Sequence, residues 1–265
     1  MFLGEAYSRA GRHSASLRAL NKSLELQPDN WLCLYHIGEV QRDLGLLEEA
    51  NETFRKILSD RPTECGVLSS YSLNLLVLGR SEKSQGFLSR AENSFISSIG
   101  VAMMIVDQEG EFRRLAWKNV IDALFELLEF SSYSENERLQ TLLGSLSPVN
   151  SYQNDGRLSD LLKGSIIPED GHLDQECVAK ALVATCSYRI QLFSEHDTNL
   201  SGAWYDLALA SYRCSQNATD DGGEQFSEQA IIFIKNAIKL NPHSASYWNA
   251  TTRSTLWTSA AFPCH

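Results

Sequence analysis

A repeat with a period of 34 residues constrains this sequence more than any other feature. Three pairs of residues in the first part of the chain show that spacing: Gly4 and Gly38, Gly11 and Gly45, and Pro28 and Pro62. A period of this length is typical of stacked helix pairs, because one pair cannot bury its apolar stripe alone. The sequence therefore predicts an all-α solenoid of antiparallel helix pairs.

The residue types at these positions have clear physical roles in the second copy. Gly38 lets the two helices of the unit approach closely, and Gly45 falls at the end of the first helix, where a positive φ is required. Ala50 and Phe54 belong to the apolar stripe of the second helix, which Pro62 ends. This layout resembles the tetratricopeptide repeat, and the resemblance implies a right-handed superhelix.

The same pattern returns in the last third of the chain, with its two helices further apart. Its signature residues, together with the aromatic residue of a following unit, are Trp204, Leu207, Ala230, Ala237, Pro242 and Trp248. The distance from Trp204 to Ala230 exceeds that of a standard unit by ten residues, and the segment 216–225 is polar and contains glycine. This segment therefore predicts an inserted loop between the two helices.

The middle of the chain is less regular. Gly79 keeps the 34-residue period from Gly45, and the segment 81–106 predicts one long helix rather than a standard second helix. Trp117 lies in a further first helix, at the packing position of the later tryptophans, so we expect these aromatic rings in the core.

Residues 131–172 are mixed in polarity and contain prolines and glycines, which predicts an irregular insertion. Short helices are expected around 138–146 and 158–163, and a longer one over 175–193. The predicted organisation has four regions: tetratricopeptide repeats in 1–95 with a truncated first unit, a divergent helical region in 96–200 with the insertion near 131–172, further repeats in 201–250 with the loop 216–225, and a non-repeat tail in 251–265.

The charge and the cysteines limit the classes of function. A net charge of −10 argues against direct binding of nucleic acid and against a polybasic membrane anchor. No segment approaches the ~20 apolar residues that cross a bilayer. The six cysteines lack the spacing of a zinc site, and the N-terminus lacks a secretory signal pattern. We therefore expect a soluble cytoplasmic protein with reduced thiols, with a nuclear pool also allowed.

The sequence shows no constellation that predicts catalysis. Its six histidines pair with no Cys or acid at metal spacing, and no glycine-rich phosphate-binding motif is present. The segment beginning at Asp197 resembles an EF-hand loop but has Ala208 where a bidentate Glu is needed. We expect no catalytic residue, no metal, no cofactor and no enzymatic activity.

The outward side of the first helices is the predicted functional face, because it lines the concave groove of a solenoid. In the second unit the residues that we expect on this partner-binding face are Tyr35, Glu39, Arg42 and Asp43. A solvated charged face without a partner is the structural alternative.

Three later stretches resemble the tetratricopeptide scaffold of the superkiller (Ski) complex. They are LAWK at 115–118 with Asp122, AWYDLALASYR at 203–213, and AIKLNPHSASYWNA at 237–250. The sequence departs from that family at Ala208, where glycine is usual, and at residues 119–121. The resemblance extends over about residues 3–250, and the order and spacing of these stretches are more specific than the repeats.

The resemblance to the superkiller scaffold implies a non-catalytic protein-interaction function. Family members hold an RNA helicase and WD-repeat subunits, and the assembly supplies RNA to the cytoplasmic exosome for 3′-to-5′ mRNA decay. A peptide-binding tetratricopeptide adaptor unrelated to RNA decay is the alternative. Because Met1 falls inside a first helix and the sequence after Ala250 leaves the repeat pattern, we expect a fragment, a splice form or a faulty gene model.

Overall fold

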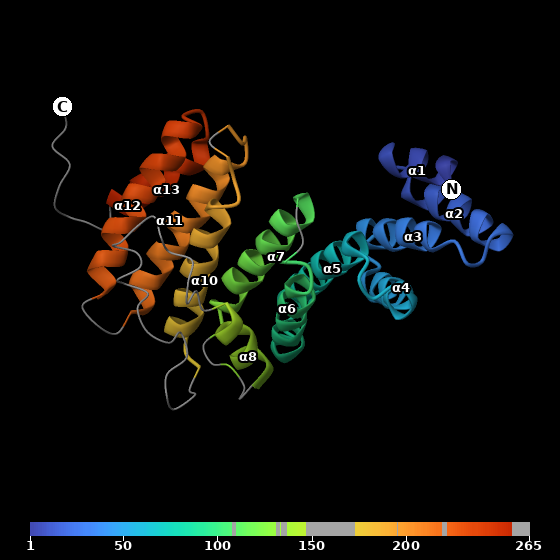
Figure 1. The fold of residues 1–265 in the computed structure, drawn as a ribbon, viewed down its shortest axis with the longest axis horizontal. Coiled ribbons are helices and arrows are strands. Elements are labelled where there is room, and N and C mark those ends of the chain that lie inside the picture. The colour runs from blue at the N-terminus through green and yellow to red at the C-terminus, as the bar shows by residue number, and fades with distance from the viewer. Residues whose placement is uncertain are drawn as a thin grey trace. The chain divides into compact units, whose positions relative to one another are not determined.

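Figure 1 shows a computed structural model of the chain. The structure describes residues 1–107, 110–130, 133, 137–146, 173–194, 196–218 and 222–255. Every regular element among these residues is an α-helix, which confirms the predicted all-α fold. The chain divides into two compact units, 1–126 and 127–265, and each is described by itself.

The first unit is a series of helices, the first six of which pack each against the next along the chain. Its helices are α1 (Phe2–Arg9), α2 (His13–Leu26), α3 (Trp31–Asp43), α4 (Leu47–Asp60), α5 (Cys65–Ser84), α6 (Leu88–Met103) and α7 (Glu111–Leu127), the last of which reaches the boundary between the units. The pairs α1–α2, α3–α4 and α5–α6 form the successive hairpins that Figure 1 shows in blue to green.

One type of turn joins the two helices of each hairpin. Gly11, Gly45 and Gly86 have φ values of 71°, 78° and 84°. The residue directly after each of these glycines closes the turn. The Leu46 N–H donates to the Gln41 carbonyl at 2.9 Å, and the equivalent groups bond in the same way in the other two turns. A positive φ carries no Cβ penalty for glycine, so the sequence places glycine at each helix end.

A close contact between a glycine and a large side chain sets the spacing of the two helices in each hairpin. A Cβ on Gly38 would lie 2.8 Å from Phe54 Cε1, and one on Gly79 would lie 2.6 Å from Phe95 Cε1. The equivalent partner of Gly4 is Leu20. In every case the large side chain is completely buried, so glycine is required where the helices touch.

The prediction of one long helix over 81–106 is wrong. The chain turns at Gly86 between α5 and α6, and Gly79 is a packing glycine inside α5 rather than a turn glycine at its end. The third hairpin therefore follows the second at a distance of 41 residues, from Gly38 to Gly79. The seven additional residues lengthen α5, which has 20 residues where α3 has 13.

The second unit also consists of helices. They are α8 (Glu137–Ser145), α10 (Gln175–Ile190), α11 (Leu200–Asn217), α12 (Gly222–Leu240) and α13 (Ala245–Thr255). The helices expected around 138–146 and over 175–193 are present as α8 and α10, whereas the one expected around 158–163 lies outside the described residues. The core of this unit lies mainly between α10, α11 and α12, which pack in that order.

The connection between α11 and α12 is shorter than the expected loop over 216–225. α11 continues to Asn217 and α12 already begins at Gly222, so most of the additional residues extend the two helices. Helical extension satisfies the backbone hydrogen bonds of these residues internally, which a polar loop does not. Among the described helices, none is long and apolar enough to cross a membrane.

A candidate protein-interaction face on the first helices

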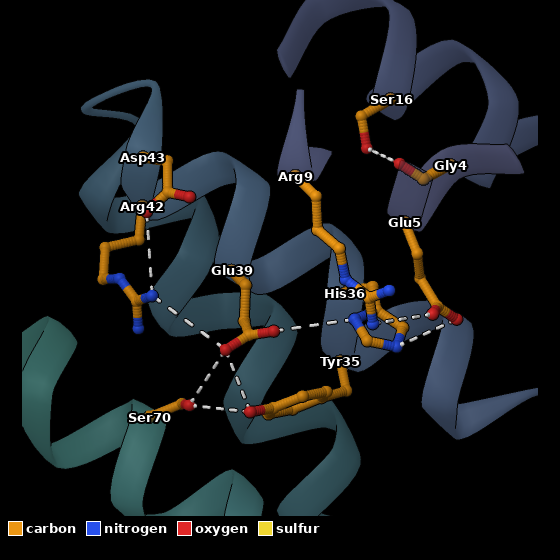
Figure 2. Close-up of polar contacts among 10 residues, drawn as sticks. All are labelled: Gly4, Glu5, Arg9, Ser16, Tyr35, His36, Glu39, Arg42, Asp43 and Ser70. Carbon is orange, nitrogen blue, oxygen red and sulfur yellow. Dashed lines mark hydrogen bonds and ion pairs between the residues drawn. The ribbon is translucent and has the colours of Figure 1, made fainter. Parts of the chain in front are cut away.

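A network of polar side chains joins the first helices of the three hairpins in the first unit, with Glu39 of α3 at its centre (Figure 2). The Tyr35 hydroxyl donates to Glu39 Oε1 at 2.9 Å, and Ser70 Oγ of α5 donates to the same oxygen at 3.4 Å. Tyr35 Oη and Ser70 Oγ lie 3.0 Å apart. One carboxylate oxygen therefore connects α3 to α5.

His36 connects the same network to α1. Its Nδ1 lies 3.5 Å from Glu39 Oε2, and its Nε2 lies 3.4 Å from Glu5 Oε1. Arg9 of α1 lies 3.8 Å from the other oxygen of Glu5 (Figure 2). The imidazole thus lies between two carboxylates that belong to successive hairpins.

Arg42 supplies a positive charge at the other side of Glu39. Its Nη2 lies 4.0 Å from Glu39 Oε1 and 3.7 Å from Asp43 Oδ1. Burial raises the pKa of Glu39, but the hydrogen bonds from His36 and Tyr35 and the charge of Arg42 outweigh it, so the pKa is lowered. Glu39 is therefore held as a carboxylate.

The electrostatics of this face favour binding over proton transfer. Burial, the largest cause, raises the pKa of Tyr35 above its ordinary value of 10.0, whereas that of Glu39 lies below its ordinary value of 4.5. Neither group changes its charge near neutral pH, so they offer fixed hydrogen-bonding groups instead of a general acid or base.

The described residues offer little other chemistry. No group of three or more His, Cys, Asp or Glu among them is placed to hold a metal ion. Burial raises the pKa of the Cys177 thiol to about 11, which keeps it protonated at neutral pH. A thiol in that state is a poor nucleophile.

Known proteins resemble the chain in both sequence and fold. The tetratricopeptide repeat family model matches residues 1–30. Superkiller protein 3 of Schizosaccharomyces pombe is 27% identical over 252 residues, and superkiller complex protein 3 of Homo sapiens is 23% identical over 254 residues. The matches cover 93% and 94% of this chain but only 18% and 14% of the two relatives, so the chain spans less than a fifth of their length.

A solved structure agrees with the fold. The crystal structure of a thermophilic tetratricopeptide repeat protein from Thermus thermophilus superposes with a TM-score of 0.53 at 14% identity, covering 96% of each chain. The chain therefore has the fold of a tetratricopeptide-repeat solenoid. The predicted resemblance to superkiller protein 3 is confirmed by sequence similarity along nearly the whole chain.

The structure places most signature residues of these tetratricopeptide repeats at helix contacts or helix ends. Each proline of the pattern (Pro28, Pro62 and Pro242) lies two residues after the end of a second helix, which ends at Leu26, Asp60 or Leu240. The apolar signature residues that are buried are Ala50, Phe54, Trp117, Leu207, Ala230 and Ala237.

Trp204 and Trp248 differ in environment although they hold the same position in the repeat. Trp204 is only partly buried, so the expectation that it lies in the core is not met in full, and its ring lies 5.7 Å from the ring of Phe233 in the second helix of its hairpin. Trp248 is 51% exposed, contrary to the expectation that it lies in the core, and its Nε1 donates to the Pro242 carbonyl at 2.8 Å. The residues after α13 lie outside the described part of the chain, so nothing described takes the position of Phe233 there.

Charged residues of the superkiller-like stretches form ion pairs in the structure. Lys118 Nζ lies 2.6 Å from Asp122 Oδ1 within α7. Asp206 of α11 accepts a hydrogen bond from Arg189 of α10 at 2.7 Å, and both side chains are nearly buried. Asp122 therefore forms an ion pair within one helix, and Asp206 links two helices.

Sequence reasoning identified part of the candidate face. Tyr35, Glu39 and Arg42 contact one another as a group, and Asp43 joins them only through Arg42. Ser70 also belongs to the face, although it is not among the residues predicted for it. The repeat pattern gives no signal for it, because Ser70 lies within the seven additional residues at the start of α5.

Proposed function

We propose that this chain is part of a non-catalytic protein-interaction scaffold of the superkiller type. The observation that carries the proposal is the similarity to superkiller protein 3, which extends over 93% of the chain. The solenoid fold supports it, because stacked helix pairs offer extended surfaces to partners. The assembly to which the scaffold belongs assists the cytoplasmic exosome in 3′-to-5′ mRNA decay.

The expected partners are an RNA helicase and WD-repeat subunits, and the expected location is the cytoplasm. The face around Glu39 is our candidate for a partner contact, with Tyr35, Arg42 and Asp43 as its other members. Because the net charge of −10 is unfavourable for contact with RNA phosphates, we expect a partner protein rather than this chain to bind the RNA. The scaffold itself then binds only proteins.

Co-purification tests the proposal. The tagged chain is co-expressed with the helicase and WD-repeat subunits, and stoichiometric capture of at least one of them is expected. Failure of every subunit to co-purify with the folded chain would contradict the scaffold function.

A pair of double variants tests the face separately. Glu39→Gln with Asp43→Asn removes two carboxylates from α3, and we expect it to weaken the capture. Glu25→Gln with Glu52→Gln removes the same charge from the second helices α2 and α4, and should leave capture unchanged. Equal capture by both double variants would exclude the face as the contact.

A peptide-binding adaptor unrelated to RNA decay is the second candidate. The observation that favours it is the set of carboxylates on α1 and α3, since Glu5, Glu39 and Asp43 would attract a cationic peptide. Fluorescence titration with short cationic peptides discriminates the two functions. Saturable tight binding without any superkiller subunit would favour the adaptor.

A further inference from the structure

Two consecutive hairpin turns of the first unit expose large apolar side chains. Leu44 and Leu46 flank the turn glycine between α3 and α4 and are 39% and 40% exposed. Phe87 and Leu88 follow the turn glycine between α5 and α6 and are 50% and 55% exposed. We call these four residues the turn patch.

Two members of the turn patch occupy positions where helices prefer polar residues. Leu46 is the N-cap of α4 and Phe87 is the N-cap of α6, and neither side chain makes a capping hydrogen bond. Ser, Thr, Asp and Asn are strongly preferred at this position because their oxygens accept from a free helical N–H. Asn30 and Asp174 cap α3 and α10 in that way, through the N–H groups of residues 33 and 177.

The geometry of the turn does not account for the apolar residues. In this type of helix ending, an apolar residue just after the glycine often packs against the third residue from the helix end. Here those third residues are Gln41 and Glu82, which are polar. Leu46 and Phe87 remain 40% and 50% exposed, so their hairpins leave much of both side chains uncovered.

The two turns lie next to each other. Arg90 of α6 contacts Glu48 in the first turn of α4, with Nη2 and Oε1 3.7 Å apart. The same guanidinium lies 5.6 Å from the centre of the Phe87 ring. Asn74 of α5 donates to the Leu47 carbonyl at 2.9 Å, which holds the third hairpin against the start of α4. The four apolar side chains therefore belong to one edge of the solenoid.

Exposed carboxylates border the turn patch on the α3–α4 side. Asp43, Glu48 and Glu49 flank its two leucines and are all exposed. Of the nearby cations, Arg42 is mostly buried and engaged with Glu39 and Asp43, so Arg90 is the exposed basic residue that the contacts above place there. An apolar surface with an acidic border is complementary to an apolar segment that also carries Lys or Arg.

We propose that the turn patch is a docking site for a basic amphipathic segment of a partner protein. Apolar side chains of the segment pack on Leu44, Leu46, Phe87 and Leu88, and its cationic side chains face Asp43, Glu48 and Glu49. The proposal rests on the scaffold function proposed above and names a second contact surface, on the turns rather than on the first helices around Glu39.

The test exploits the opposite effects that the proposal predicts for binding and for stability. The double variant Leu46→Asn with Phe87→Asn installs preferred capping residues and removes half of the turn patch. The probe is a fluorescent helical peptide with leucines on one face and lysines on the other, titrated into the full chain by anisotropy. We expect the double variant to bind the probe at least about tenfold more weakly while its unfolding temperature stays the same or rises by about 2–4 °C.

Two controls make the result specific. Leu26→Asn with Leu240→Asn removes two exposed leucines elsewhere and should bind the probe as the parent chain does. A peptide with glutamates in place of the lysines should bind the parent chain at least about tenfold more weakly, because it meets the carboxylates. Equal binding of the parent chain and the patch variant, or of the two peptides, would overturn the proposal.

The co-purification experiment separates this proposal from the scaffold function. Patch-dependent binding of the lysine peptide without capture of any superkiller subunit would support the turn patch and contradict the scaffold. Capture of a subunit by both the parent chain and the patch variant, with no patch-dependent peptide binding, would support the scaffold function and contradict the turn patch.

Discussion

The α3–α4 and α5–α6 hairpins share a turn and a close contact but differ in length. In both, a buried phenylalanine seven residues into the second helix touches a glycine in the first helix, and a glycine with positive φ follows the first helix. From packing glycine to helix end the distance is the same, Gly38 to Asp43 and Gly79 to Ser84. The additional length of α5 therefore lies entirely before its packing glycine.

The N-terminal half of α5, which contains the additional residues, is rich in serine and is held by hydrogen bonds to neighbouring helices. Ser70 reaches the Glu39 network of the preceding hairpin. Ser72 Oγ donates to the Ser98 carbonyl of α6 at 3.0 Å and also lies within 3.3 Å of Asn119 Nδ2 of α7. The comparison shows that the turn and the glycine contact define a hairpin, whereas the start of the first helix is free to lengthen if small polar residues line it.

Removal of the two phenylalanines should have the largest effect. Phe54→Ala and Phe95→Ala each create a cavity at a fully buried site, so each should lower the free energy of unfolding by about 3–5 kcal/mol. Urea unfolding followed by circular dichroism measures the change, and Phe87→Ala at the exposed turn is the control. A much smaller loss for Phe95→Ala would show that the serine contacts, rather than the glycine contact, define the third hairpin.

Substitution of the packing glycine should have the next largest effect. Gly79→Ala places a Cβ 2.6 Å from Phe95, so it should destabilise by about 1–3 kcal/mol despite the better helix propensity of alanine. Gly66→Ala lies in the same helix and would meet Phe112 only at 3.7 Å. This control should be neutral or stabilising by up to about 1 kcal/mol in thermal unfolding. Equal effects at the two glycines would contradict the contact.

The turn glycines should respond alike in the two hairpins. Gly45→Ala and Gly86→Ala meet no atom within 4 Å, so only the positive φ opposes the methyl group. Each should cost about 1–2 kcal/mol in urea unfolding, with equal values because the φ angles are 78° and 84°. A clear difference between the two would mean that the longer α5 changes the turn.

Substitution of two carboxylates that contact α5 should have the smallest effect on stability. Glu39 accepts a hydrogen bond from Ser70 of α5, and Glu126 accepts hydrogen bonds from Arg80 and Lys83 of α5. Burial raises the pKa of Glu126, but the hydrogen bonds and charges of Lys83 and Arg80 outweigh it, so its pKa, like that of Glu39, lies below the ordinary value of 4.5. A lowered folded pKa gives stability that is present above the ordinary value and is lost as pH falls through the lowered value.

Glu39→Gln and Glu126→Gln should therefore each lower the free energy of unfolding at pH 7 by less than about 1 kcal/mol. The difference from the parent chain should shrink as the pH falls to about 3, measured by urea unfolding at each pH. A difference that grows toward acid pH would contradict the direction of the pKa shifts. Lys22→Ala, which breaks an exposed pair on α2, is the control with no expected change.

The sequence predicted the repeat architecture but misplaced one hairpin for a specific reason. Packing and turn glycines lie seven residues apart in each unit, and the insertion in α5 also has seven residues. Gly79 therefore falls one 34-residue period after the turn glycine Gly45, although it is a packing glycine. Only its contact with Phe95 and the positive φ of Gly86 show the correct assignment.

The candidate face was predictable in its position but not in its membership. Helical spacing places Tyr35, Glu39 and Arg42 on one side of α3. The partners on α1 and α5 depend on how neighbouring hairpins pack, and this brings Glu5 and Ser70 to the two sides of the α3 residues. The exposure of Leu46 and Phe87 likewise depends on packing, and the N-cap position of Phe87 follows only from the turn at Gly86.

The sequence by itself determined the first two helix pairs, their turn glycines Gly11 and Gly45 and their closing prolines, because these depend on local backbone preference and on apolar periodicity. The tertiary structure alone decided where α5 begins, which carboxylates surround His36 and how far a signature aromatic is covered, since Trp204 is partly buried and Trp248 is exposed. Each of these depends on contacts between helices, and the repeat period along the chain does not specify which side chains of neighbouring helices meet.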